Sequence, residues 1–90
     1  MLIDNVSGAF DSRGIEWPGG PGLFETASAS AGQTTELQRL GGDNITWVIV
    51  GVSMEGNVVI NFDLDKSTIR LSQASGTNVF ADIKSRRFSP

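Results

Sequence analysis

The chain has 90 residues, of which 39% are hydrophobic and 19% charged, and its formal net charge is −3. It contains neither Cys nor His, which excludes disulfide frameworks, thiolate and imidazole metal sites, and the Ser–His–Asp and Cys–His nucleophile systems. The length suits one small domain, and the excess of acidic residues disfavours nucleic-acid binding. We therefore expect a binding, structural or assembly protein, not an enzyme, that uses no cofactor and no metal.

The N-terminal quarter of the chain combines short β-favouring runs with strong chain breakers. Residues 5–10 and 15–17 predict two short strands, and five residues, Pro18-Gly19-Gly20-Pro21-Gly22, follow that we expect to lie outside any ladder. We therefore divide the chain into an extended N-terminal arm with its Pro/Gly-rich connection, residues 1–22, and a β-sandwich domain, residues 23–90.

The body continues with strand signals and no long helical period. Residues 23–31 predict a strand, and residues 34–40 predict a strand or a short helix, of which the paired Thr34-Thr35 favours the strand. The continuous apolar run 45–52 predicts a central strand that is covered on both faces.

Three alternating segments complete the pattern and each predicts a strand with one face in the core: 58–64, 68–72 and 79–84. About eight short strands at regular spacing favour a small antiparallel β-sandwich of jelly-roll-like type, and therefore an all-β fold. No stretch is apolar for long enough to span a bilayer, and the N-terminus lacks the pattern of a signal peptide, so we expect no membrane partner.

Two polar loops are candidates for metal or sugar binding. Asp63-Leu64-Asp65-Lys66-Ser67 places oxygens at alternate positions, like the start of a calcium loop. An EF-hand loop, however, needs Gly at its sixth position and Glu at its twelfth, where this chain has Thr68 and Ala74. A polar turn is the favoured interpretation, and the loop around Asp43 is in the same way interpreted as a hairpin loop.

The two tryptophans have different predicted roles. Trp47 lies in the most apolar run and is expected in the core, whereas Trp17 adjoins the Pro/Gly break and is expected to be an exposed anchor. We predict a partner-binding set in the arm, with stacking on sugar as the alternative for Trp17: Phe10, Ile15, Trp17, Pro18 and Pro21.

The basic residues cluster near the C-terminus, at Lys84, Arg86 and Arg87. They favour an edge strand that is protected by charge against pairing with other edges, and contact with an acidic partner is the second interpretation.

Several segments together resemble a known family. They read Val-Ser-Gly-Ala-Phe from Val6, Pro-Gly-Gly-Pro-Gly-Leu-Phe-Glu-Thr-Ala from Pro18, and Thr-Thr-Glu-Leu-Gln-Arg-Leu-Gly-Gly-Asp-Asn-Ile-Thr-Trp-Val from Thr34, followed by Thr-Ile-Arg-Leu-Ser from Thr68 and Asn-Val-Phe-Ala-Asp-Ile from Asn78. The pattern is similar to that of small structural proteins of tailed bacteriophages. Where that pattern has an Asp-Gly turn, this chain has Asp43-Asn44, which a left-handed turn position tolerates.

The resemblance implies a virion protein without catalytic residues. Its expected function is that of a capsid decoration (cement) protein, made in the host cytoplasm and located on the head surface of the virion. The expected partners are the major capsid protein and further copies of the chain, with a homotrimer matching the local threefold positions of a shell. The alternative is a head-fibre or tail domain that binds carbohydrate on the host surface, in which Trp17 or Asp43, Asp63 and Asp65 would hold the glycan.

Overall fold

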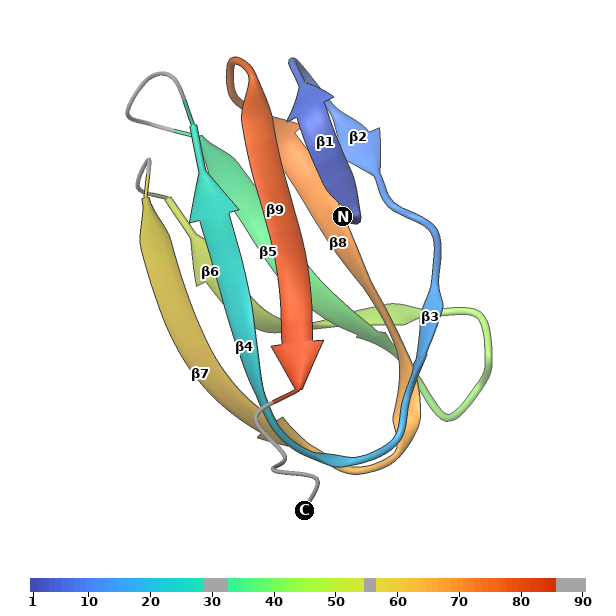
Figure 1. The fold of residues 1–90 in the computed structure, drawn as a ribbon. Helices are drawn as coiled ribbons and strands as arrows, with labels where there is room; N and C mark the ends of the chain where they lie inside the picture. The colour runs from blue at the N-terminus through green and yellow to red at the C-terminus, as the bar shows by residue number, and fades with distance from the viewer. Residues whose placement is uncertain (29–32, 55–56, 86–90) are drawn as a thin grey trace.

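The computed structural model describes residues 1–28, 33–54 and 57–85 (Figure 1). Within these ranges the chain forms nine strands in two antiparallel sheets. The first sheet has the order β1-β9-β4-β7, and the second has the order β2-β8-β5-β6 with β3 also paired to β8. The strands are β1 (Ile3–Val6), β2 (Phe10–Asp11), β3 (Ile15–Trp17), β4 (Gly20–Ala27), β5 (Thr34–Leu40), β6 (Trp47–Ser53), β7 (Val58–Leu64), β8 (Ser67–Ser75) and β9 (Val79–Ser85).

The strand order is that of a jelly roll. Strands β2 and β3 both pair with β8 and share one place in the second sheet, so the sandwich has eight strand positions. The chain passes from one sheet to the other between successive strands, except within the second sheet at β2–β3 and β5–β6. The expected all-β sandwich of about eight short strands is confirmed.

The core lies between the sheets and follows the period-two alternation of the sequence. Ile69 and Leu71 of β8 are fully buried and form one apolar cluster with Leu37 of the neighbouring β5 and Phe24 of β4 in the other sheet. Ile60 and its inward-facing neighbours on β7 pack against this cluster, while alternate residues of that strand face solvent. The predicted inward faces of residues 58–64, 68–72 and 79–84 are confirmed, because a strand with one buried face must alternate.

The N-terminal segment, which the sequence predicted to be an arm, is part of both sheets. Strand β1 pairs with β9, while β2 and β3 pair with β8, and Ile3 and Trp17 belong to the buried core. The single strand predicted over residues 5–10 is wrong. Asn5, with a φ of 57°, lies within β1 where the register with β9 shifts, and β1 ends at Val6. Gly8, with a φ of 82°, lies in the connection that takes the chain to the other sheet.

Two further expectations about strands are corrected. The Pro/Gly-rich segment does enter a ladder, because β4 starts at Gly20 and Pro21 lies opposite Asp63 of β7. Pairing with β9 begins only at Gly22 in the described residues, so Pro21 has a strand neighbour on one side, which proline tolerates. The prediction that residues 45–52 form a central strand is also wrong, because β6 lies at the end of its sheet. The strand predicted at 34–40 is confirmed as β5.

Candidate functional site

The five residues predicted to bind a partner do not form one patch. Phe10 is 39% exposed and lies opposite Gln73 of β8, whereas Trp17 lies opposite Ser67 of the same strand. Six residues of strand separate these positions, which corresponds to about 20 Å. Pro18 and Pro21 are exposed near the Trp17 end, and Ile15 is half-buried against the core.

Trp17 is part of the core and is only 4% exposed, so the expectation of an exposed anchor is wrong. Its ring centroid lies 5.1 Å from that of Phe62, and its Nε1 donates a hydrogen bond of 3.3 Å to the carbonyl of Gly20. Gly22 leaves the space for this ring, because a Cβ atom there would lie 2.7 Å from Cη2 of Trp17. The Pro/Gly run therefore bends around a buried tryptophan, and its small residues make room for it.

Trp47 is half-buried on the outer face of the second sheet, so the expectation that it lies in the core is wrong. The guanidinium carbon of Arg70 lies 4.2 Å from the centroid of the indole, a cation–π contact. Arg70 Nε also donates to Oε1 of Gln38 at 2.8 Å, and Gln38 Nε2 donates to Oε1 of Glu36 at 3.2 Å. These contacts tie β5, β6 and β8 together across their outer surface.

The carboxylates proposed for a glycan or calcium site do not line the groove of about 360 Å³ that lies between their chain neighbours Asn44 and Lys66. Asp43 accepts hydrogen bonds from the N–H groups of Ile45 and Thr46 and from the Thr46 hydroxyl within its own loop. Asp63 lies in β7, and Asp65 lies in the turn before β8. Among the described residues, no group of three His, Cys, Asp or Glu side chains is placed to hold a metal ion.

The β6 edge, which we define by Val48, Ile49 and Val52, is an apolar surface, although the sequence predicted a strand covered on both faces at this place. These side chains are 42%, 55% and 43% exposed, and Ile45 and Met54 just outside the strand are exposed as well. The signal was present in the sequence as an uninterrupted apolar run. That pattern is shared by strands buried inside a protein and by strands that meet a partner.

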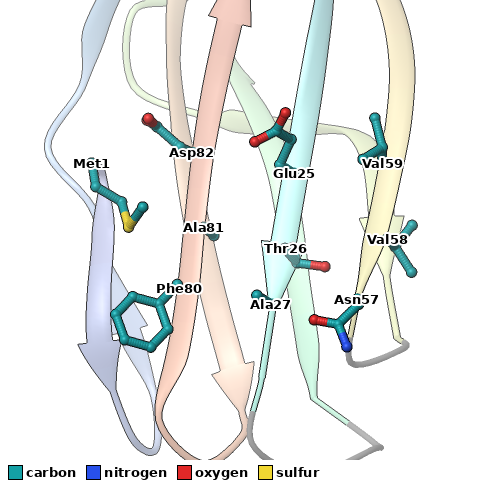
Figure 2. Close-up of a pocket in the computed structure, with 10 residues that line it drawn as sticks. All are labelled: Met1, Glu25, Thr26, Ala27, Asn57, Val58, Val59, Phe80, Ala81 and Asp82. Carbon is teal, nitrogen blue, oxygen red and sulfur yellow. The ribbon is translucent and has the colours of Figure 1, made fainter.

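A second apolar surface covers the outer face of the first sheet (Figure 2). It surrounds an open groove of about 400 Å³ over β4, β7 and β9. We call it the Phe80 face and define it by four apolar residues and two carboxylates: Met1, Ala27, Val59, Phe80, Glu25 and Asp82. Phe80 is 37% exposed and Val59 58%, so both residues leave large apolar area in contact with water.

The two carboxylates of the Phe80 face lie directly opposite each other, Glu25 on β4 and Asp82 on β9. Like charges in this position repel. Lys84 Nζ approaches Oε2 of Glu25 to 3.4 Å, whereas Asp82 has no ion-pair partner in the part of the chain that the structure describes. The face therefore offers a carboxylate beside exposed apolar side chains.

Lys84 pairs with Leu23 of β4, whereas the printed pairs between β1 and β9 are at Val79 and Ala81. Lys84 therefore lies beyond the end of β1, and its role in protecting an edge stays a prediction. Arg86 and Arg87 lie outside the described residues.

No helix in the described ranges is long and apolar enough to cross a membrane. Comparison of the chain with known protein families, with curated proteins and with solved structures finds no match.

Proposed function

We propose that the chain is a non-catalytic decoration protein of a tailed-phage head, which binds the major capsid protein and acts as a homo-oligomer. The virion assignment comes from the sequence resemblance. The observation that carries the binding role is the Phe80 face, a broad apolar surface on a thin sandwich, whose Asp82 has no ion-pair partner among the described residues. The molecule measures 34 × 34 × 17 Å along its principal axes, so its sheets form two broad outer faces.

The chemistry of the Phe80 face indicates what it binds. Apolar residues at the centre of a surface with a few charged groups beside them are typical of protein interfaces. Because Asp82 lacks a partner among the described residues, the complementary surface should present a basic side chain next to apolar ones. Jelly rolls occur in viral capsid and lectin domains, an analogy of fold that supports the proposal without deciding it.

The carbohydrate-binding alternative has one observation in its favour, a groove of about 360 Å³ that is lined by Asn44, Lys66 and their neighbours, but none of the residues predicted to hold the glycan lines it. Trp17 is buried, and Asp43, Asp63 and Asp65 lie in separate segments.

A binding experiment tests the proposal directly. Purified protein is mixed with head shells of the source virus that lack it, and bound protein is measured after sedimentation. Val59→Glu places a charge in the Phe80 face at an exposed position, and we expect it to weaken binding by at least about tenfold, since burying an unpaired charge is costly. Asp82→Asn should weaken binding less and make it less sensitive to salt.

Ile45→Glu is the matched control, because Ile45 is 80% exposed and lies outside the Phe80 face. It should bind like the wild type. Equal binding by all three variants, or no binding by the wild type, would contradict the proposal.

A further inference from the structure

The four edges of the two sheets are not equally protected against pairing with another strand. Exposed edges are normally shortened, interrupted, or marked by charged residues. Strand β1 has four residues, an exposed Asp4 and irregular pairing with β9; the opposite sheet ends in the short β2 and β3, which carry Asp11 and Glu16. Strand β7 is long but carries Asp63. Each of these three edges therefore has at least one protective feature that discourages pairing.

Strand β6 differs from the other edges. Its seven residues, Trp-Val-Ile-Val-Gly-Val-Ser, include no charge and no proline. It pairs with β5 on one side, and no strand of the described residues pairs with its other side. The outer backbone groups of a long, uncharged strand are thus left available for a further strand.

The one irregularity of β6 increases the apolar area that it exposes. Leu37 of β5 pairs with Gly51 and Gln38 pairs with Ile49, so Val50 is an extra residue that forms a bulge. The bulge changes the alternation of the strand: Val50 packs against the core, and the consecutive residues Val48 and Ile49 are both exposed. Both faces of the edge therefore carry β-branched side chains in contact with water.

A second copy of the chain fits this edge for a reason of symmetry. When two identical strands pair about a twofold axis, each residue near the axis lies close to its own copy. A charged residue there would face the same charge and repel it. Because β6 has no charged residue, it can pair with itself without such repulsion, and each copy supplies the same β-branched surface to the other.

We propose that two copies of the chain associate by antiparallel pairing of their β6 strands, which joins two second sheets into one continuous sheet. The contact consists of main-chain hydrogen bonds between the strands and of apolar packing by the β6 edge on both faces. This inference deepens the proposed function and rests on the part of it that makes the chain a homo-oligomer.

The first test measures mass in solution by light scattering or sedimentation equilibrium on the full chain. The proposal predicts about 19 kDa, twice the 9.6 kDa of one chain, with dissociation on dilution. Ile49→Glu should weaken the dimer by at least about tenfold, because each interface loses two buried isoleucines and gains two facing charges. Val59→Glu, an equally exposed β-branched residue on the β7 edge, is the matched control and should leave the dimer intact.

A second test locates the contact and uses the absence of cysteine in the chain. Single cysteines are placed in turn at positions 48 to 52 and oxidised. In antiparallel pairing, one position comes within disulfide distance of its own copy, and cross-linking should fall off on either side of it. Val59→Cys should give no rapid cross-link. A maximum within β6 fixes the axis of the dimer.

The outcomes separate this inference from the proposed function. A monomer, a trimer, a dimer that Ile49→Glu leaves unchanged, or the absence of any cross-link in β6 would overturn the β6 contact. Binding to head shells is measured separately: a β6-linked dimer that does not bind shells would leave this inference standing and contradict the decoration role.

Discussion

At the residue scale, Asp43 shows how a loop holds one ionised group in place. Hydrogen bonds from the Thr46 hydroxyl, then from the N–H groups of Thr46 and Ile45, lower the pKa of Asp43 from its ordinary value of 3.8 to about 2. Asn44 next to it has φ of 58°, the left-handed position that the sequence predicted for this turn. The loop is thus built around a carboxylate that is fully engaged within it.

The lowered pKa of Asp43 gives a pH-dependent prediction. Because the folded pKa lies below the unfolded one, the stabilisation of the loop is complete above about pH 4 and is lost as pH falls towards about 2. Thr46→Val removes the hydroxyl donor, so we expect the pKa of Asp43 to rise towards 3.8 while the two N–H donors keep it below that value. The pKa of Asp43 is measured by NMR titration of the carboxyl carbons. Thr77→Val is the control and should leave this pKa unchanged. An unchanged pKa in Thr46→Val would show that the hydroxyl is not the main cause.

Gly22 gives a second prediction at the residue scale. A Cβ atom there would lie 2.5 Å from Cζ of Phe62 and 2.7 Å from Cη2 of Trp17, and both rings are held by packing. Gly22→Ala should therefore lower the free energy of unfolding by about 1–3 kcal/mol, as overpacking typically does. A Cβ at Gly42 meets nothing within 4 Å, so Gly42→Ala should change stability by less than about 0.5 kcal/mol. Urea unfolding gives the free energy of unfolding of Gly22→Ala and of Gly42→Ala. Equal values for the two variants would argue against the close packing of Trp17.

At the scale of the elements, strands β1, β2 and β3 are needed for the fold. They cover one side of β8 and of β9, and they contribute Ile3 and Trp17 to the core. Deleting residues 1–19 should therefore abolish cooperative thermal unfolding, because it exposes two strand edges and opens the core. Phe10→Ser changes an exposed residue of the same segment, and this variant should still unfold cooperatively. Near-UV circular dichroism is the measurement, and a truncated protein that still melts sharply would mean that this segment is dispensable.

The strands that could be predicted are those with one buried face. Residues 58–64 and 68–72 alternate because one side of each strand meets the core, and this periodicity is visible in the sequence. The position of β6 was not predictable in the same way, since an uninterrupted apolar run is compatible with a central strand and with an edge that meets a partner. Trp17 was misplaced because adjacent chain breakers indicate a turn but do not determine whether a side chain is buried.

The candidate site was only partly visible in the sequence. Val59 and Phe80 occupy the outward positions of alternating strands, where large apolar residues are a signal of a contact surface. The alternation of the sequence predicts that both side chains point outward, but the predicted partner-binding residues lay between positions 10 and 21. The grouping of Val59 with Phe80, and of Glu25 with Asp82, depends on the neighbours of β4 across the sheet, which only the fold reveals.

At the scale of the whole molecule, the two apolar surfaces lie on different parts of the sandwich. The Phe80 face covers the outer side of the first sheet, and the β6 edge ends the second sheet. A partner on one surface leaves the other free, so a β6-linked dimer can present a Phe80 face from each copy. A dimer that carries two such faces should bind a repetitive surface more strongly than a single chain does, because its second contact is intramolecular.

The measurement that tests the central claim most directly is the copy number of the chain in gradient-purified virions of its source, by quantitative mass spectrometry. A decoration protein of the head shell should be present in a ratio to the major capsid protein that is close to one or to a simple fraction of one. A few copies per particle, or none, would contradict a shell-wide role. The first of these results would place the chain at a tail, vertex or fibre, and the second would leave it a β-sandwich that binds a partner outside the virion.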